Sequence, residues 1–120
     1  MRIAIDVDDT ITSAPGFFAV LSGAFRAAGH VVYVVTQRTD RSQTETELKA
    51  LGIAYDELVT QEASQASGTT FFDWKAETCR RLQIDILFED MPEIVNGIDA
   101  ATRVFMLFTP ERGRVWYHRR

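Results

Sequence analysis

Short apolar runs alternate with amphipathic stretches along most of the chain. Runs rich in Val, Ile and Leu, typical of buried strands, lie at residues 2–6, 30–36, 55–60, 84–88 and 104–108. Stretches with helical patterning lie between them, at residues 17–28, 42–51, 72–82 and 92–101. Gly29 and Gly52 each follow such a stretch, where glycine commonly ends a helix. Residues 13–16 are expected to form a turn, and the polar residues 61–70 a loop.

Alternation of strands and helices with short connections predicts an α/β fold. We expect a Rossmann-like three-layer sandwich, in which a mostly parallel five-stranded sheet carries helices on both faces. With 120 residues, the chain is expected to form a single domain, 1–120, around one core. Ligands of such sheets bind at the carboxyl ends of the strands. The residues just after each strand are therefore the candidates for a functional site.

Composition indicates an ordinary globular protein, with 46% hydrophobic residues, 25% charged residues and a net charge of -4. Apolar runs stay well below the roughly 18 residues of a membrane-spanning helix, and the N-terminus does not resemble a signal peptide. The single cysteine, Cys79, excludes an internal disulfide and is expected to have a packing role. We therefore expect a cytoplasmic protein without membrane association, and the mild acidity disfavours a general nucleic-acid binder.

Acidic residues follow two of the predicted strands. Asp6, Asp8 and Asp9 come within four positions after the first strand, and Glu89 and Asp90 follow the fourth. Two unit charges 4 Å apart repel by about 4 kcal/mol at an effective dielectric constant near 20. A hard divalent cation relieves this repulsion, and Mg²⁺ suits a site with a few carboxylates and several waters. The pattern predicts a magnesium site, and solvated turn acids are the alternative.

Two further residues point to phosphate chemistry. Thr36 ends the second strand, and Lys75 lies near the start of a helix, whose amide end favours anions. An ammonium and a metal ion would neutralise phosphoryl oxygens while a hydroxyl orients them. The alternative for Lys75 is a solvated helix lysine.

Together these residues resemble the motifs of the haloacid dehalogenase (HAD) superfamily. The stretch 6–10, DVDDT, resembles the first motif, DxDx[TV]. Thr36 is similar to the second motif, Lys75 to the third, and Glu89-Asp90 to the acidic fourth. The motifs occur in the family's order over about residues 1–108. The resemblance implies an HAD-like phosphatase fold and activity.

The resemblance also implies roles for these residues. Asp6 would be the nucleophile that forms an aspartyl-phosphate, and Asp8 the general acid and then the general base. Mg²⁺ would be held by Asp6, the backbone carbonyl of Asp8, and Asp90 or Glu89. Thr36 and Lys75 would bind the phosphoryl group. An Asp at position 8 favours a phosphatase over a dehalogenase.

Two positions depart from the family's pattern. Asp9 replaces a usual glycine, and no catalytic role follows for it from the sequence. Glu89 stands where Gly or Asp is more common, so the metal ligand of the fourth motif is either Glu89 or Asp90.

The spacing of the motifs bears on the substrate. About 30 residues separate Asp6 from Thr36 and about 40 separate Thr36 from Lys75, so no large cap domain is expected. An open site would suit a bulky or macromolecular phosphoester, or would be closed by another subunit in an oligomer. Residues 36–59 resemble polynucleotide 3′-phosphatase domains, where Arg38 would bind the substrate phosphate or structure its loop.

The C-terminal end is basic and aromatic, and it either contacts a polynucleotide by charge and stacking or forms an exposed tail or a terminal strand. Its basic residues are Arg112, Arg114, His118, Arg119 and Arg120. Trp116 and Tyr117 lie among them.

Two other functions remain as alternatives. Response-regulator receiver domains are about this size and surround Mg²⁺ with Asp, Thr and Lys, but their phosphorylated Asp ends the third strand. Here the third strand ends in Val59-Thr60. The other alternative is a catalytically silent HAD-like binding module, against which the intact acids, Thr36 and Lys75 count.

Overall fold

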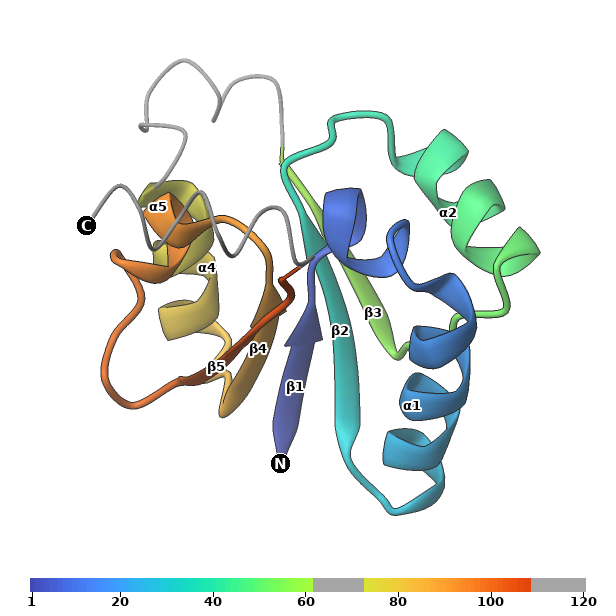
Figure 1. Cartoon of the computed structure of the whole chain (residues 1–120), viewed down its shortest axis with the longest axis horizontal. Helices are drawn as coiled ribbons and strands as arrows, with labels where there is room; N and C mark the ends of the chain where they lie inside the picture. The colour runs from blue at the N-terminus through green and yellow to red at the C-terminus, as the bar shows by residue number, and fades with distance from the viewer. Residues whose placement is uncertain (62–72, 109–120) are drawn as a thin grey trace.

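Five parallel strands form one sheet in the part of the chain that the computed structural model describes, residues 1–61 and 73–108 (Figure 1). The strands are β1 (Arg2–Ile5), β2 (Val31–Thr36), β3 (Glu57–Thr60), β4 (Ile86–Glu89) and β5 (Arg103–Met106). Their order is β3-β2-β1-β4-β5, and each neighbouring pair is parallel. The first strand of the chain is therefore the middle strand of the sheet.

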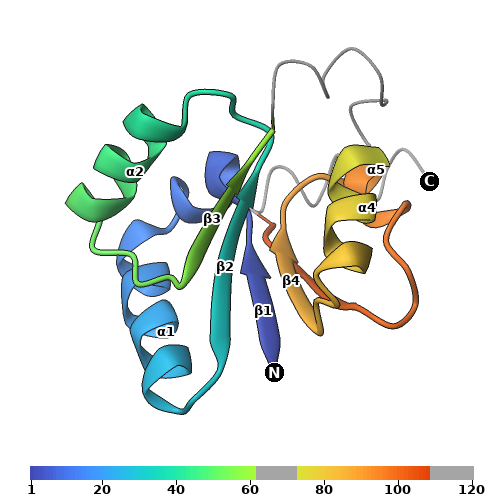
Figure 2. The same cartoon turned by 180° about the vertical axis from the view of Figure 1, so that it is seen from behind.

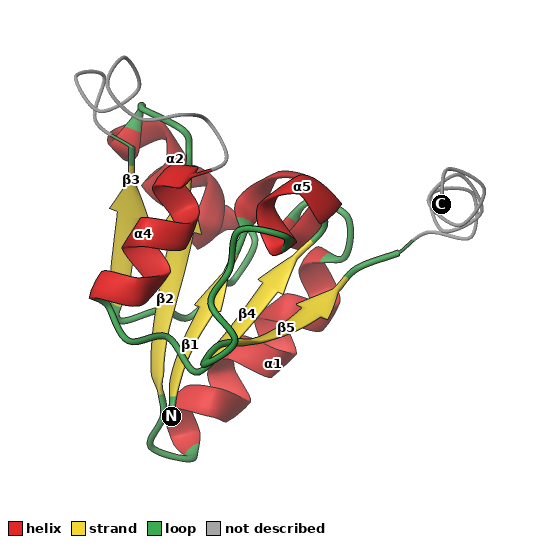
Figure 3. Cartoon of the chain, turned by 90° about the vertical axis from the view of Figure 1, so that its left-hand side faces the viewer, coloured by secondary structure: helices red, strands yellow, loops and turns green. Residues whose placement is uncertain are grey.

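Helices cover both faces of this sheet (Figures 2 and 3). One face carries α1 (Pro15–Ala27) and α2 (Arg41–Ala50), and the other carries α4 (Asp73–Arg81) and α5 (Pro92–Val95). Successive side chains of β1 point to opposite faces of the sheet. Ile3 and Ile5 therefore pack with Phe18 on one face, while Ala4 packs with Trp74 on the other. The expected Rossmann-like three-layer α/β fold is confirmed.

The sheet order brings three strand ends together. Ile5 is in register with Val34 of β2 on one side and with Phe88 of β4 on the other. The residues that follow these positions therefore lie at the same carboxyl edge, where α/β folds bind ligands.

Most expected elements form, with shifts at their ends. Gly29 and Gly52 follow α1 and α2 with φ of +88° and +75°, a conformation that glycine adopts without a Cβ penalty, so both predicted helix stops are confirmed. α1 begins at Pro15, earlier than expected, because proline is well suited to a first helical turn. Residues 15–16 thus belong to the helix and not to the predicted turn.

The helix expected at residues 92–101 is wrong in its length. α5 ends at Val95, and the backbone N–H groups of Gly97 and Ile98 bond to carbonyls three residues back, those of Ile94 and Val95. Asn96-Gly97 is a turn dipeptide, and a glycine inside a helix costs about 1 kcal/mol relative to alanine.

Two predicted strands are displaced as well, since β4 spans Ile86–Glu89 and β5 spans Arg103–Met106. The polar segment at 62–70 and the basic residues from 112 onward lie outside the described residues. No helix in residues 1–61 and 73–108 combines the length and the apolar character needed to cross a membrane.

Candidate active site

A wide turn, η1 (Val7–Ile11), follows β1 directly. It is closed by two backbone hydrogen bonds across five residues, from Ile11 N–H to the Asp6 carbonyl (3.3 Å) and from Thr12 N–H to the Val7 carbonyl (3.1 Å). Such π-type turns are rare in proteins, and those that occur often lie at functional sites. Asp6 stays buried below the turn, whereas Asp8 and Asp9 are exposed on it.

Asp9 has a backbone role in this turn. Its φ of +60° and ψ of 6° lie in the left-handed region, which Asp tolerates better than most residues. Its N–H donates to Thr12 Oγ1 at 2.9 Å. A glycine at position 9 would adopt this conformation without a Cβ penalty.

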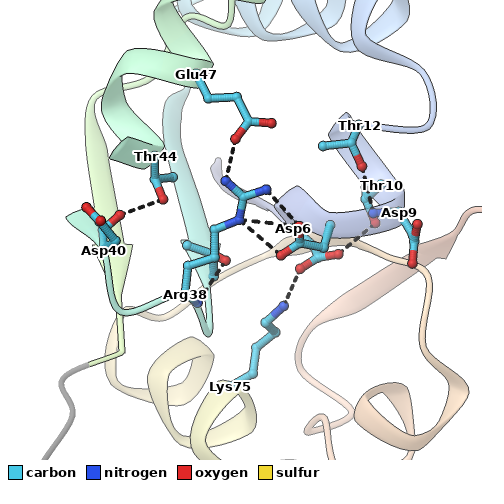
Figure 4. Close-up of polar contacts among 11 residues, drawn as sticks. Asp6, Asp9, Thr10, Thr12, Arg38, Asp40, Thr44, Glu47 and Lys75 are labelled. Atoms are coloured by element: carbon cyan, nitrogen blue, oxygen red, sulfur yellow. Dashed lines mark hydrogen bonds and ion pairs between the residues drawn. The ribbon is translucent and has the colours of Figure 1, made fainter. Parts of the chain in front are cut away.

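Below the turn, three buried carboxylates meet one buried ammonium, and Figure 4 shows the contact of the ammonium of Lys75 with Asp6. Lys75 reaches from the first turn of α4, and its Nζ lies 2.6 Å from Asp6 Oδ1 and 3.0 Å from Glu89 Oε2. The Lys75 side chain is 1% exposed, so it is not the solvated lysine of the alternative interpretation. The third acid is Asp90, and oxygens of Asp6, Glu89 and Asp90 lie within 4.8 Å of one another.

Thr10 joins the same cluster. Its Oγ1 lies 2.9 Å from Asp6 Oδ2 and 3.3 Å from Asp90 Oδ1, and the single hydroxyl proton favours the closer oxygen. Thr10 belongs to the DVDDT stretch, from which no role was predicted for it. The contact depends on the η1 turn, which returns Thr10 to the acid four residues before it.

The charges of this cluster do not balance. When all three acids are ionised, Lys75 offsets one of three negative charges. Burial raises the pKa of Asp6 to about 7, with Lys75 opposing this effect and Glu89 adding to it. Burial also raises the pKa of Glu89, against the effect of Lys75. Burial alone would lower the pKa of Lys75, but Asp6 and Glu89 outweigh it and raise the pKa. The cluster can hold a metal ion, which would supply the missing positive charge.

A hollow of about 380 Å³ opens above the cluster. Its lining consists of Asp6, Asp8, Asp9, Thr36, Gln37, Arg38, Glu89, Asp90, Met91 and Ile94. Every site residue predicted from the sequence lies on this lining except Lys75, which contacts Asp6 from beneath. Gln37, Met91 and Ile94 were not predicted, because their side chains carry no catalytic signal.

Thr36 lies at the end of β2 and is 1% exposed. Its Oγ1 accepts a hydrogen bond from the backbone N–H of Arg38 at 3.2 Å. The hydroxyl therefore lines the hollow and also shapes the loop that carries Arg38.

Asp8 does not share the acid cluster; its carboxylate, 61% exposed, contacts Arg38. Arg38 Nη2 lies 2.7 Å from Asp8 Oδ1, Nε lies 3.2 Å from Asp8 Oδ2, and Nη1 lies 2.5 Å from Glu47 Oε2 (Figure 4). The hydrogen bonds that the Arg38 guanidinium donates to Asp8 and Glu47 raise its pKa. Glu47 was not predicted, since nothing in the sequence separates it from the other acids of α2.

Comparison with known proteins identifies the fold. No family model and no curated protein matches this sequence. A chain of the solved Pnkp1/Rnl/Hen1 complex is similar in structure, with a TM-score of 0.69 over 88% of this chain and 16% sequence identity. The two share a fold. This chain matches 45% of the length of that neighbour.

Proposed function

We propose that this chain is an HAD-type phosphohydrolase that uses Mg²⁺ and an aspartyl-phosphate on Asp6 to hydrolyse a phosphomonoester. The observation that carries the proposal is the convergence of Asp6, Glu89, Asp90 and Lys75 under one hollow at the carboxyl edge of the sheet. These residues come from three of the four motifs, and Thr36, from the remaining motif, lines the same hollow. The fold shared with a chain of the Pnkp1/Rnl/Hen1 complex supports this placement.

The donor set fits a hard divalent cation. Asp6, Asp90 and Glu89 would offer carboxylate oxygens, and the backbone carbonyl of Asp8 would complete the protein ligands. Since Glu89 already holds Lys75 at 3.0 Å, we propose Asp90 as the main ligand of the fourth motif. Bound Mg²⁺ would supply positive charge to the phosphoryl oxygens.

In the proposed reaction, a carboxylate oxygen of Asp6 attacks phosphorus while the bond from phosphorus to the leaving oxygen breaks. Asp8 donates a proton to that oxygen and then accepts a proton from water. The water attacks the aspartyl-phosphate, releasing inorganic phosphate and restoring Asp6. Lys75 favours the ionised, attacking form of Asp6, and Lys75 and Thr36 orient the phosphoryl group.

The candidate substrates are a nucleotide, a polynucleotide end and a sugar phosphate, and an open site would favour a bulky or macromolecular phosphoester. Between Asp6 and β2 the chain forms η1 and α1, with no large cap there. A polynucleotide contact by the basic C-terminal residues, closure by a second subunit, a single domain over 1–120 and a cytoplasmic location stay predictions. Assaying metabolite phosphates beside a 3′-phosphorylated oligonucleotide ranks the substrate classes.

The test of the function is hydrolysis of 4-nitrophenyl phosphate with and without Mg²⁺, by the wild type and by Asp6→Asn. We expect turnover that requires the metal and that Asp6→Asn abolishes. Metal-independent turnover, or an Asp6→Asn protein as active as the wild type, contradicts the mechanism. Mg²⁺ binding without turnover of any phosphoester would favour the silent binding module.

A receiver domain is disfavoured by the sheet. Receiver-type sheets follow the order 2-1-3-4-5, whereas this sheet follows 3-2-1-4-5 and places β3 at its edge. Asp6 follows the middle strand, β1. A long-lived phosphoprotein formed from a small phosphodonor would reverse this preference.

A further inference from the structure

Arg38 links two acids that come from different elements. Its Nε and Nη2 hold the carboxylate of Asp8 in η1, and its Nη1 holds the carboxylate of Glu47 in α2. All three guanidinium nitrogens are thus engaged by protein acids. Among the described residues, Arg38 is the partner that the Asp8 carboxylate contacts.

The two catalytic acids are fixed in different ways. Asp6 is buried, and Lys75 and Thr10 each hold one of its carboxylate oxygens. Asp8 is exposed, so burial does not restrict its rotamers. A bidentate guanidinium fixes both the position and the plane of a carboxylate. The orientation of Asp8 therefore depends on what orients Arg38.

Arg38 is anchored at both ends. Its backbone N–H donates to Thr36 Oγ1 at 3.2 Å, and its carbonyl accepts from Gln61 N–H at 3.1 Å. The far end of the side chain meets Glu47. Thr36 of β2 and Gln61, the residue after β3, thus hold the backbone of Arg38. Glu47 of α2 holds its guanidinium.

Glu47 lies in α2, a helix that is capped at its N-terminus and packed against the core. The side chain of Asp40 caps α2 by accepting from Gln43 N–H at 2.9 Å. Thr44 and Leu48, on either side of Glu47 along the helix, are buried, and Leu48 belongs to the core cluster of β1 and β2. The carboxylate of Glu47 is therefore presented from a rigid part of the molecule.

We propose that Glu47 is a positioning residue, which orients Asp8 for proton transfer by holding the Arg38 guanidinium. This inference rests on the proposed phosphatase function. It assigns Arg38 to the positioning of Asp8, in place of substrate phosphate binding. Proton transfer requires the acid within about 2.6–3.2 Å of the leaving oxygen, so a freely rotating Asp8 would be a poorer catalyst.

Comparing two leaving groups distinguishes a positioning role of Glu47 from a purely structural one, which would affect both substrates equally. Phenol is a much weaker acid than 4-nitrophenol, so expelling it needs proton donation far more. The value of kcat/KM reports phosphoryl transfer to Asp6, before water attacks. Loss of Asp8 orientation should therefore lower kcat/KM for phenyl phosphate much more than for 4-nitrophenyl phosphate.

The experiment compares Glu47→Ala, Glu47→Gln and Glu45→Ala with the wild type in Mg²⁺. Glu45 is the matched control, because it lies on the same helix and pairs with Arg41 at 2.9 Å. For Glu47→Ala we expect a loss of about tenfold with phenyl phosphate and under about threefold with 4-nitrophenyl phosphate. Glu47→Gln should lie between, since an amide oxygen still accepts from Arg38, and Glu45→Ala should match the wild type.

A second background tests whether Glu47 acts through Arg38. Lysine cannot form the two-pronged contact of arginine, so in Arg38→Lys the change Glu47→Ala should add no further selective loss. A full additional loss there overturns the inference, as does an equal loss with both esters in Glu47→Ala alone.

The proposed function and the inference fail separately. If the wild type hydrolyses neither ester, the proposed function falls and takes the inference with it. If it hydrolyses only the 4-nitrophenyl ester, there is no proton donation to orient, and the inference is overturned while the phosphatase stands.

Discussion

Lys75 is the cation that contacts two of the three buried acids. Its ammonium lies within 3.0 Å of both Asp6 and Glu89, and the three side chains are nearly inaccessible to solvent. Removing one partner of a buried ion pair leaves its counter-charge without compensation, at a cost of about 3–5 kcal/mol. The lysine therefore stabilises the fold as well as the proposed chemistry.

We expect Lys75→Met to lower the free energy of unfolding by about 3–5 kcal/mol at pH 7 without metal, as measured by urea denaturation. The control is Lys49→Met, at the exposed end of α2, which should stay within about 0.5 kcal/mol of the wild type. Equal stability of the two variants would contradict the role given to Lys75.

The raised pKa of Asp6 predicts how the metal-free protein responds to pH. The folded pKa of about 7 lies above the ordinary value of 3.8 for an aspartate, so the folded state binds the proton more tightly than the unfolded state. The resulting stabilisation is complete below about pH 4 and is lost as the pH rises through 7. Asp6→Asn cannot titrate, so we expect its unfolding temperature to fall less than that of the wild type between pH 5 and 8 in thermal scans. A wild type that gains stability relative to Asp6→Asn over this range would contradict the shift.

Sequence reasoning found the acids, Thr36 and Lys75 because charged and hydroxyl groups at strand ends are unusual and because their spacing resembles known motifs. It missed Thr10 and Glu47 for a physical reason. Their importance lies in what they contact, and those contacts depend on the η1 turn and on the rotation of α2 about its axis. Neither is encoded in a local pattern.

At the scale of the element, η1 decides which acids are buried. Its hydrogen bonds, each spanning five residues, form a wide turn directly after β1. Asp6 therefore faces the acid cluster, while Asp8 and Asp9 reach the surface. Alternation along an extended strand would have sent Asp6 and Asp8 to the same side. Asp9 has a left-handed backbone in this turn, a conformation that β-branched side chains disfavour.

Substitutions of Asp9 should reveal the backbone strain of its left-handed conformation. We expect Asp9→Gly to stabilise the protein by up to about 1 kcal/mol, because glycine adopts positive φ without strain. Asp9→Val should destabilise it by about 1–2 kcal/mol, since a β-branched residue resists this conformation. Urea unfolding of both variants measures the difference in their free energies of unfolding. An Asp9→Val protein more stable than Asp9→Gly would contradict the left-handed backbone strain at position 9.

Element boundaries were predictable where a single residue decides them. Gly29 and Gly52 end their helices as expected, because glycine adopts the left-handed backbone there without a Cβ penalty. The helix expected at residues 92–101 ran too far because its apolar residues fit a helical period even though Asn96-Gly97 interrupts the backbone. Periodicity describes side chains, and the turn is a property of the main chain.

At the scale of the whole molecule, the order of the strands creates the site. β1 lies between β2 and β4, so acids from the first and fourth strand ends meet beside a hydroxyl from the second. The strand–helix pattern predicted the α/β class and parallel strands, but it could not give the order 3-2-1-4-5. That order depends on packing between residues far apart in the sequence.

The whole fold should therefore respond to divalent cations. We expect Mg²⁺ to raise the unfolding temperature, with a gain of about 2.7 kcal/mol at 100 times the dissociation constant. Asp90→Asn should lose most of this gain. Asp99→Asn is the control, because Asp99 is paired with Arg80 on the surface, outside the acid cluster. Thermal scans with and without Mg²⁺ provide the measurement, and an equal gain in both variants would place the ion elsewhere.

The central position of β1 also affects how the protein folds during synthesis. β1 is synthesised before β4, and the site contacts join distant residues, since Asp6 and Lys75 are 69 residues apart and Thr10 and Asp90 are 80 apart. Until β4 arrives, β1 offers an unpaired edge to any neighbouring chain. Pairings between distant segments make folding slow, and an incomplete chain that stops before β4 lacks Glu89 and Asp90 altogether. The topology that concentrates the acids therefore delays assembly of the site until β4 and Asp90 have been synthesised.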